Sequence, residues 1–288
     1  RLTNPAIDPI REELVMSLTE YIGAVGTNIL TPDASNCKMV RLPQPVLTNT
    51  QLDILCNIRY KGFKTIKMPM TSHLPISPLG EEPNWEKAGE NLRNALDKLC
   101  KDAEDAVDKG YNYIILTDKV ELLPQGGGPE GAFYIPSLLA VSAVHHYLIS
   151  VGKRVQTALI VESGEIRETM HAALLLGYGA SALCPYMTFA VLDDLVKRHK
   201  IQEEYATAEK NYIKAVDKGL KKIMSKMGIS TIRSYRGAKI FESIGLSEDL
   251  LRRYFGTEVS TIGGIGLKEI ARDAIRFQRA ASSLPSKD

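Results

Sequence analysis

The sequence predicts an α/β protein in which an incomplete, TIM-barrel-like parallel sheet has flanking helices and a helical C-terminal part. Short apolar segments alternate with amphipathic helical segments between residues 63 and 190, a pattern typical of β-α units. The apolar segments lack polar alternation, which indicates strands buried on both faces. About four convincing strands can be found, too few for a closed eight-stranded barrel.

Composition excludes several classes of protein. The chain has 288 residues, 44% of them hydrophobic and 24% charged, so it can bury a core and is not disordered as a whole. A net charge of +2 gives no electrostatic footprint for nucleic acid. No basic amphipathic tract indicates a membrane surface. We expect one domain over 1–288, with a helical or irregular connector at 1–62, a βα half-barrel at 63–190 and a helical part at 191–288.

The connector is predicted to begin with a helix opened by Asp8-Pro9, where Asp8 can cap and Pro9 suits the first turn. Apolar residues then recur at helical spacing as far as Gly23; they are Ile10, Leu14, Leu18 and Ile22. Residues 24–47 are expected to be irregular. Thr48-Asn49-Thr50 supplies cap residues for a second helix that carries Leu52, Leu55 and Cys56.

In the half-barrel, strands are expected at 63–68, 111–117, 154–161 and 180–184, and helices at 85–109, 135–150 and 165–176. Two loops interrupt this order, a proline-rich one through Pro75, Pro78 and Pro83 and a glycine-rich one at 125–128. After residue 190 the pattern predicts only helices, around 190–200, 204–226, 236–244, 247–254 and 267–280.

Two stretches have more than one interpretation. Residues 172–192 carry no charge and reach the length of a membrane span, but Gly177, Gly179 and Pro185 interrupt them. A helix end, a turn, a buried strand and a new helix fit better. The lysine-rich segment 210–226 has apolar residues at three- and four-residue steps, which indicates a solvated face on a packed helix.

Candidate site residues occur after strands and before one helix. Asp118 and Glu162 follow strand ends, where parallel α/β folds build their sites. Alternatively, they cap the next helices or pair with Lys119 and Arg167. The Gly263–Gly266 turn before a helix could cradle a phosphate or could be only a turn.

Metal and redox signals are weak. His145 and His146 are adjacent on a helix, so they cannot form an i, i+4 metal pair, and His171 is expected in the core. The four cysteines are far apart, which fits buried thiols in a reducing compartment and no zinc or iron–sulfur site; they are Cys37, Cys56, Cys100 and Cys184. The residues alone show no complete catalytic constellation.

Several ordered strings resemble the central domain of the glutamate synthase large chain. They run over nearly the whole sequence, at 4–12 (NPAIDPIRE), 45–49 (PVLTN), 135–146 (IPSLLAVSAVHH), 161–165 (VESGE), 174–180 (LLLGYGA), 225–231 (SKMGIST) and 234–238 (SYRGA). The resemblance implies a rudimentary version of an FMN barrel, in agreement with the strand count.

The resemblance also implies the setting. The parent enzyme of this family makes glutamate from glutamine and 2-oxoglutarate, in ammonia assimilation. A cysteine-dependent amidotransferase domain precedes the central domain, and a domain with FMN and an iron–sulfur cluster follows it. Electrons come from a small NAD(P)H-oxidising subunit or from ferredoxin. This segment itself is then expected to hold no cofactor and no active site, and to lie in the bacterial cytoplasm or, in a eukaryote, in the plastid or cytosol, without secretion.

The implied role of the central domain is to connect these two domains and to help wall an ammonia channel. The matching wall residues are Leu47, Thr48 and Asn49, with Ile22 and Gly23 of the Tyr21-Ile22-Gly23 turn as a second wall. The competing hypothesis is a free-standing half-barrel enzyme or a binding module for a phosphorylated ligand, built from the strand-end carboxylates and the Gly263–Gly266 turn.

Overall fold

A computed structural model describes residues 5–7, 12–24, 30, 38–73, 84–119, 132–256 and 260–282 of the chain. The opening of the expected first helix at Asp8-Pro9, Cys37, most of the proline-rich loop and the glycine-rich 125–128 loop lie outside these residues.

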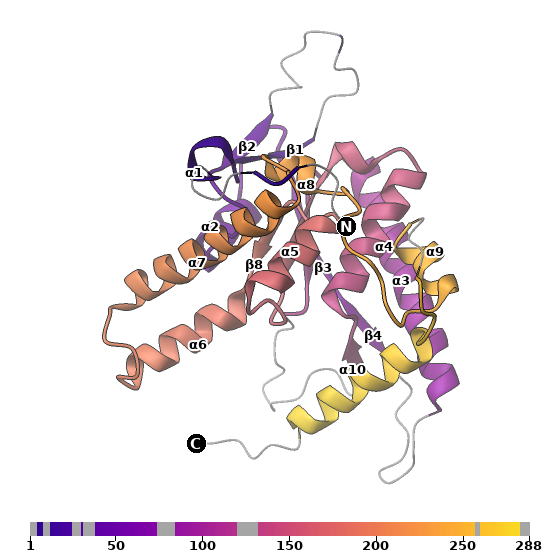
Figure 1. Ribbon diagram of the computed structural model, residues 1–288. Coiled ribbons are helices and arrows are strands. Elements are labelled where there is room, and N and C mark those ends of the chain that lie inside the picture. The colour runs from indigo at the N-terminus through magenta and orange to yellow at the C-terminus, as the bar shows by residue number, and fades with distance from the viewer. Residues whose placement is uncertain are drawn as a thin grey trace.

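Four parallel strands form the main sheet, as the sequence predicts. They are β3 (Thr65–Pro69), β5 (Tyr113–Thr117), β7 (Ala158–Glu162) and β8 (Ala182–Cys184), in the order β3-β5-β7-β8. Their carboxyl ends are in register, because Thr117 is paired with Glu162 and Glu162 with Cys184. The sheet stands at the centre of the molecule in Figure 1.

One face of the sheet, called here the outer face, is covered by three helices: α3 (Trp85–Asp108), α4 (Ser137–Ser150) and α5 (Thr169–Gly177). Helix α4 contacts β5 and β7 directly and lies between α3 and α5. The predicted apolar stripe of α3 is buried, with Leu92, Leu96 and Ala103 fully enclosed. The starts of α4 and α5 fall two to four residues after the predicted positions, within ordinary boundary error.

The other face, called here the inner face, is covered by the N-terminal part of the chain. Helix α2 (Asn49–Cys56) and the antiparallel hairpin of β1 (Glu20–Gly23) with β2 (Met39–Leu42) lie there. Thr65 Oγ1 donates to the carbonyl of Leu55 in α2 at 2.7 Å. Within a closed barrel this face would be the interior; here other elements fill it.

Over the described residues 12–22, the predicted helix is wrong beyond Val15. In this range the structure has the short helix α1 (Glu12–Val15), followed by strand β1. Leu14 is 81% exposed, whereas Glu20 and Ile22 are each 2% exposed, so burial here follows the two-residue period of a strand. The region 24–47, expected to be irregular, supplies the partner strand β2.

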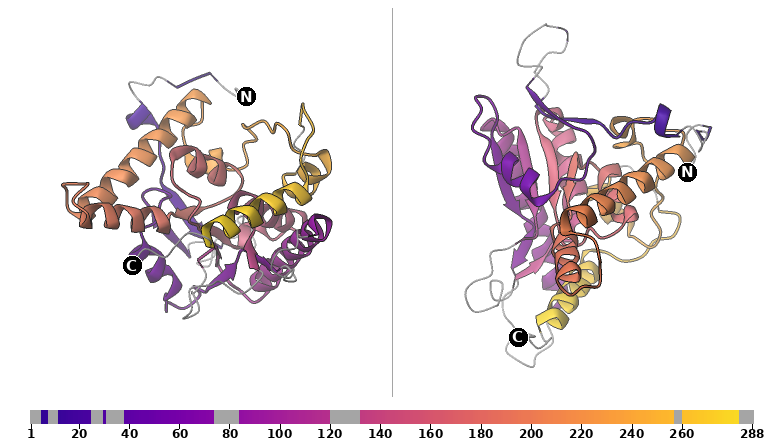
Figure 2. Two further views of the ribbon diagram at one scale, coloured as in Figure 1. Left: turned by 90° about the horizontal axis from the view of Figure 1, so that it is seen from below. Right: turned by 90° about the vertical axis from the view of Figure 1, so that its left-hand side faces the viewer.

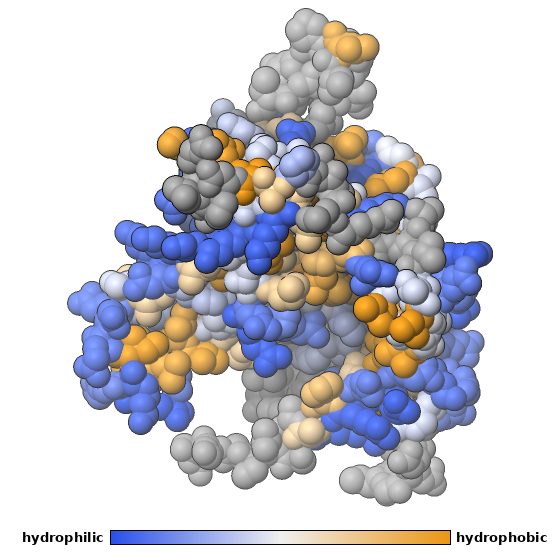
Figure 3. Space-filling view, viewed as in Figure 1, coloured by the Kyte–Doolittle hydropathy of each residue, from blue (hydrophilic) through white to orange (hydrophobic). Residues whose placement is uncertain are grey.

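The C-terminal part is helical, as predicted, with α6 (Tyr186–Lys197), α7 (Tyr205–Lys226), α8 (Ile232–Tyr235), α9 (Glu248–Tyr254) and α10 (Leu267–Ser282). Helices α6 and α7 lie side by side and project from the body, and α10 packs along α3 (Figures 1 and 2). The lysines of α7 face solvent, and hydrophilic residues cover this region in Figure 3.

Three further differences from the sequence prediction concern short elements. The helix expected at 236–244 is absent, because Gly237 and Lys239 both adopt positive φ, +70° and +53°, which a helix does not allow. A second antiparallel pair was not foreseen, formed by β4 (Thr71–His73) and β6 (Ala132–Tyr134). The 3-10 helix η2 (Arg154–Gln156) occupies the expected start of the third strand. In the described residues no helix is both long and apolar enough to cross a bilayer.

Candidate functional site

The predicted wall residues Leu47, Thr48 and Asn49 are fixed to the edge of the sheet. The N–H of Leu47 donates to the carbonyl of Leu183 at 2.7 Å, and Val46 forms a parallel bridge to the same residue. The side chain of Leu47 is only 2% exposed. The segment therefore continues the sheet beyond β8 by one short, parallel stretch.

Thr48 and Asn49 then begin α2. Thr48 makes a complete capping box: its hydroxyl accepts from Gln51 N at 3.2 Å, and its own N–H donates to Gln51 Oε1 at 3.0 Å. Asn49 Oδ1 accepts from Cys184 Sγ at 3.4 Å. These contacts confirm the predicted cap and hold both side chains at the carboxyl end of β8.

Ile22 and Gly23 lie on β1, against the first residue of β5. The buried Tyr113 hydroxyl donates to the carbonyl of Ile22 at 3.2 Å. Gly23 has a φ of +142°, and a Cβ there would come within 2.8 Å of Lys38 O and 3.3 Å of the Tyr113 hydroxyl. Only glycine fits both this backbone conformation and this space.

The two wall segments thus share the inner face but contact opposite ends of the strands. Tyr113 is the first residue of β5, whereas Cys184 is the last residue of β8, in register with Glu162 and Thr117. Four strand steps separate the two ends, which is about 13 Å at the usual rise per residue. The structure does not bring the two segments into one cluster.

The strand-end carboxylates meet at the carboxyl edge of the sheet, with partners that the sequence did not indicate. Glu162 is 3% exposed and accepts from Lys67 Nζ at 3.0 Å and from Thr117 Oγ1 at 2.8 Å. Its ion-pair partner is Lys67, not the predicted Lys119 or Arg167. No local pattern in the sequence indicated Lys67, because its partner Glu162 is 95 residues away along the chain.

Asp118 reaches across to the turn after β7. Its carboxylate accepts from Ser163 Oγ at 2.5 Å and from Gly164 N at 3.1 Å. Burial raises the pKa of Asp118, although the hydrogen bonds from Ser163 and Gly164 oppose the shift. In the part of this edge that the structure describes, these polar groups are therefore hydrogen-bonded to one another.

The Gly263–Gly266 turn does not favour phosphate either. The N–H of Ile265 donates to Gly245 O, and the N–H of Gly266 donates to Glu269 Oε2, both at 2.9 Å. A neighbouring cavity of ≈ 540 Å³ is lined by more carboxylates than cations; its charged residues are Glu86, Glu90, Asp249, Glu269, Arg93 and Lys268. The carboxylate of Glu269 already takes the place at the start of α10 that an anion would need.

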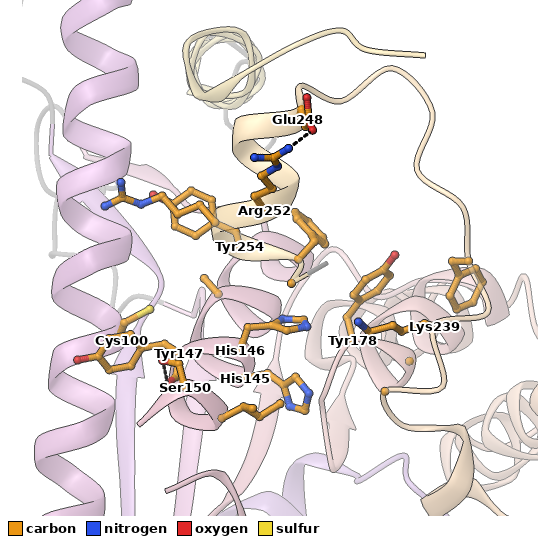
Figure 4. Close-up of a pocket in the computed structure, with 18 of the residues that line it drawn as sticks. Cys100, His145, His146, Tyr147, Ser150, Tyr178, Lys239, Glu248, Arg252 and Tyr254 are labelled. Carbon is orange, nitrogen blue, oxygen red and sulfur yellow. Dashed lines mark hydrogen bonds and ion pairs between the residues drawn. The ribbon is translucent and has the colours of Figure 1, made fainter. Parts of the chain in front are cut away.

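A larger cavity of ≈ 1160 Å³ lies between α4, α9 and the stretch 237–241 (Figure 4). His145 and His146 of α4 project toward it, with Tyr178 and Lys239 on the far side. Its two arginines, Arg253 and Arg252, are paired with Asp97 and Glu248. The cavity contains none of the predicted wall residues.

The histidines differ in burial, and the prediction for His171 is wrong. His145 is buried, and desolvation lowers its pKa to about 2, so it stays neutral. His171 is not in the core, because its side chain is 37% exposed and its Nδ1 accepts from Arg167 N at 3.2 Å. Within the described ranges no group of three or more His, Cys, Asp or Glu side chains could hold a metal. Cys56, Cys100 and Cys184 are free thiols.

Taken together, the fold and these contacts define a parallel βα half-barrel whose inner face is covered by its own N-terminal segment. A family model described as "Glutamate synthase central domain" matches residues 1–247. The chain belongs to the glutamate synthase central domain family.

The similar proteins include glutamate synthases named for three different electron donors: NADPH, NADH and ferredoxin. The NADPH glutamate synthase large chain of Bacillus subtilis is 40% identical over 281 residues, covering 98% of this chain. The chloroplastic ferredoxin-dependent enzyme of Spinacia oleracea is 40% identical over 287 residues and 96% of this chain. The NADH enzyme of Schizosaccharomyces pombe is 38% identical over 283 residues and 95% of this chain. The chain spans only 17%, 17% and 12% of these relatives.

Among solved structures, the recombinant flavin-binding domain of baker's yeast flavocytochrome b2 is similar at a TM-score of 0.38 and 15% identity, over 58% of this chain and 40% of that one. A mandelate oxidase structure is similar at a TM-score of 0.36 and 15% identity, over 54% of this chain and 43% of that one.

Proposed function

We propose that this chain connects the amidotransferase domain of a glutamate synthase large chain to its FMN and iron–sulfur domain, and that it walls part of the ammonia route between them. The family membership and the share of each relative that the chain spans support a connecting role. The parent would make glutamate from glutamine and 2-oxoglutarate.

The observation that carries the wall assignment is the way the two segments are held. Leu47, Asn49 and Ile22 are each bonded to a residue of the main sheet, Leu183, Cys184 and Tyr113 respectively. Backbone that is tied to a parallel sheet cannot drift, and Gly23 adds no side chain. Such a surface suits the passage of a small neutral molecule, which needs constant width and little competing water.

The opposite placement of the two segments refines the proposal. A route that both segments border must extend for at least the length of a strand, about 13 Å. Thr48-Asn49 and Ile22-Gly23 would then be two separate points on it. Obstruction at either point should suffice to interrupt transfer.

The partners follow from the parent. The amidotransferase and FMN domains would be the neighbours of this segment, and a small NAD(P)H-oxidising subunit or ferredoxin would supply electrons to the whole enzyme. The relatives include enzymes named for NADPH, for NADH and for ferredoxin, and one named as chloroplastic. We place the parent in the cytoplasm, or in the plastid or cytosol of a eukaryote.

The test uses the full-length parent with Thr48→Trp or Asn49→Trp. Bulk at this point should obstruct ammonia while both active sites remain functional. Glutamine hydrolysis and flavin reduction should stay measurable, whereas glutamate formed by reductive synthesis per glutamine hydrolysed should fall. The measurement is the ratio of ammonia released to glutamate made.

Ile54→Trp is the matched control, because Ile54 lies on the same helix and is 63% exposed. It should leave the ratio unchanged. If the ratio of both wall variants equals that of the parent, with correctly folded protein, the channel-wall assignment is wrong and only the capping role of Thr48 remains.

A further inference from the structure

Strand β1 needs an anchor from outside its own hairpin. A two-stranded hairpin is at best marginally stable alone, and β1 pairs with β2 and not with any strand of the main sheet. The position of Ile22 and Gly23 on the inner face must therefore come from tertiary contacts of β1.

The first anchor is a buried ion pair at the start of β1. Glu20 is 2% exposed, and its Oε2 lies 2.8 Å from Nη2 of Arg236, whose side chain is 19% exposed. Arg236 Nε also donates to Ala180 O at 3.1 Å, just before β8. Two nitrogens of the planar guanidinium thus link β1 to the amino end of a sheet strand, a geometry that the single nitrogen of a lysine ammonium does not reproduce.

Arg154 supports the amino ends of the neighbouring strands beside this pair. Its Nη1 donates to Thr157 O and its Nη2 to Gly179 O, both at 2.7 Å, and its Nε donates to His145 Nδ1 at 2.9 Å. Thr157 directly precedes β7 and Gly179 precedes β8. Burial lowers the pKa of Arg154, with the charge of Arg236 adding to the shift and that of Glu20 opposing it.

The second anchor is Tyr113, which is fully buried. Burial raises its pKa to about 12, so the hydroxyl keeps its proton and donates to Ile22 O. The same oxygen lies 3.3 Å from the position that a Gly23 Cβ would take. Tyr113 therefore holds the carbonyl of one wall residue and limits the space at the next.

The segment before β1 is tied to the same region. Ser17 N donates to Ser230 O at 2.8 Å, and Ile232 N donates to Ser17 O at 3.0 Å. Residues 230–236 therefore hold the chain both before β1 and at its first residue. This leaves Ile22 and Gly23 with little freedom to move along the sheet.

From these contacts we infer that Arg236 and Tyr113 are positioning residues of the ammonia route, which fix the Ile22-Gly23 wall at the amino end of the sheet. The inference rests on the proposed function. Neither residue touches ammonia in this proposal; each acts through the backbone of β1.

The test compares Tyr113→Phe and Arg236→Lys in the full-length parent. Tyr113→Phe removes only the hydroxyl, and Arg236→Lys keeps the charge but cannot hold Glu20 and Ala180 O together. In both variants the ammonia released per glutamate formed should rise severalfold, while the rate of glutamine hydrolysis stays close to that of the parent. If Arg236→Lys fails to fold, Tyr113→Phe decides alone.

The matched controls remove the same groups elsewhere. Tyr254→Phe deletes a buried hydroxyl that has no hydrogen-bond partner among the described residues, and Arg252→Lys alters an exposed ion pair with Glu248. In both control variants the ammonia released per glutamate formed should equal that of the parent. If Tyr113→Phe lowers the unfolding midpoint but leaves the ammonia released per glutamate formed unchanged, the inference is wrong. It is also wrong if the control variants release as much ammonia per glutamate as Tyr113→Phe and Arg236→Lys.

Thr48→Trp and Asn49→Trp, measured in parallel, separate the two proposals. If the two Trp variants release more ammonia per glutamate formed and Tyr113→Phe and Arg236→Lys do not, the positioning inference is wrong while the wall proposal stands. If none of the four variants releases more ammonia per glutamate, the wall proposal has failed and the positioning inference fails with it.

Discussion

At the scale of single residues, the buried side chains divide into those that fill the core and those that fix one segment to another. Leu175 belongs to the first group, because it is 3% exposed on α5 and its side chain has no polar atom. Arg236 and Tyr113 belong to the second group, because each bonds to a segment remote in the chain. Substitutions in the two groups should therefore change different measurable properties.

We expect Leu175→Ala to lower the free energy of unfolding by about 2–5 kcal/mol, because a buried Leu truncation loses transfer free energy and leaves a cavity. Denaturant unfolding of the purified chain measures this. Met170→Ala is the control on the same helix, since Met170 is 50% exposed, and it should have little effect. An unchanged midpoint for Leu175→Ala would mean that this face of α5 is not packed in solution.

At the scale of elements, α2 shows how a short helix can be fixed at both ends. Its eight residues are too few for stability from helix formation alone. The capping box at Thr48 and the bond from Thr65 Oγ1 to Leu55 O hold its two ends, and Leu52 and Leu55 are buried between them.

Removing the cap should therefore destabilise the protein without obstructing any route. Thr48→Ala should lower the free energy of unfolding by about 0.5–2 kcal/mol, the usual loss for an N-cap hydroxyl. In the full-length parent, the ammonia released per glutamate formed should stay unchanged. Thr50→Ala is the control, because Thr50 is exposed and is not the cap. Thermal or denaturant unfolding measures the stability. A rise in ammonia released per glutamate formed in Thr48→Ala would contradict the expectation and would show that the capping and wall roles cannot be separated at this residue.

At the scale of the whole molecule, the half-barrel has closed its inner face with its own N-terminal segment. At the carboxyl edge, the Lys67 ammonium and the Ser163 hydroxyl, which could donate to an anion, are engaged by the carboxylates of Glu162 and Asp118. A four-stranded sheet also lacks the later strands whose loops commonly hold phosphate in complete barrels.

We therefore expect the purified 288-residue chain to bind no FMN and to show neither glutaminase nor synthase turnover. An absorption spectrum after incubation with FMN and removal of the free flavin measures binding. Bound flavin near one-to-one stoichiometry would contradict the expectation and would direct attention back to the carboxyl edge and the Gly263–Gly266 turn.

The sequence by itself determined the main sheet, its outer helices and the cap of α2. Apolar runs mark β5 and β7, an uninterrupted stripe marks α3, and Thr48 with Gln51 marks the start of α2. These signals are local, because propensity, periodicity and capping act within a few residues. The ordered strings of residues also identified the family.

Only the tertiary structure decided what lies on the inner face and which polar groups meet. Residues 14, 18 and 22 fit a helical period, yet β1 forms because β2 pairs with it and because Arg236, more than 200 residues further along the chain, forms an ion pair with Glu20. Likewise Lys67 forms an ion pair with Glu162, and the two wall segments contact opposite ends of the strands of the main sheet. No local pattern encodes such pairs, because each depends on how remote segments are brought together by burial of the shared core.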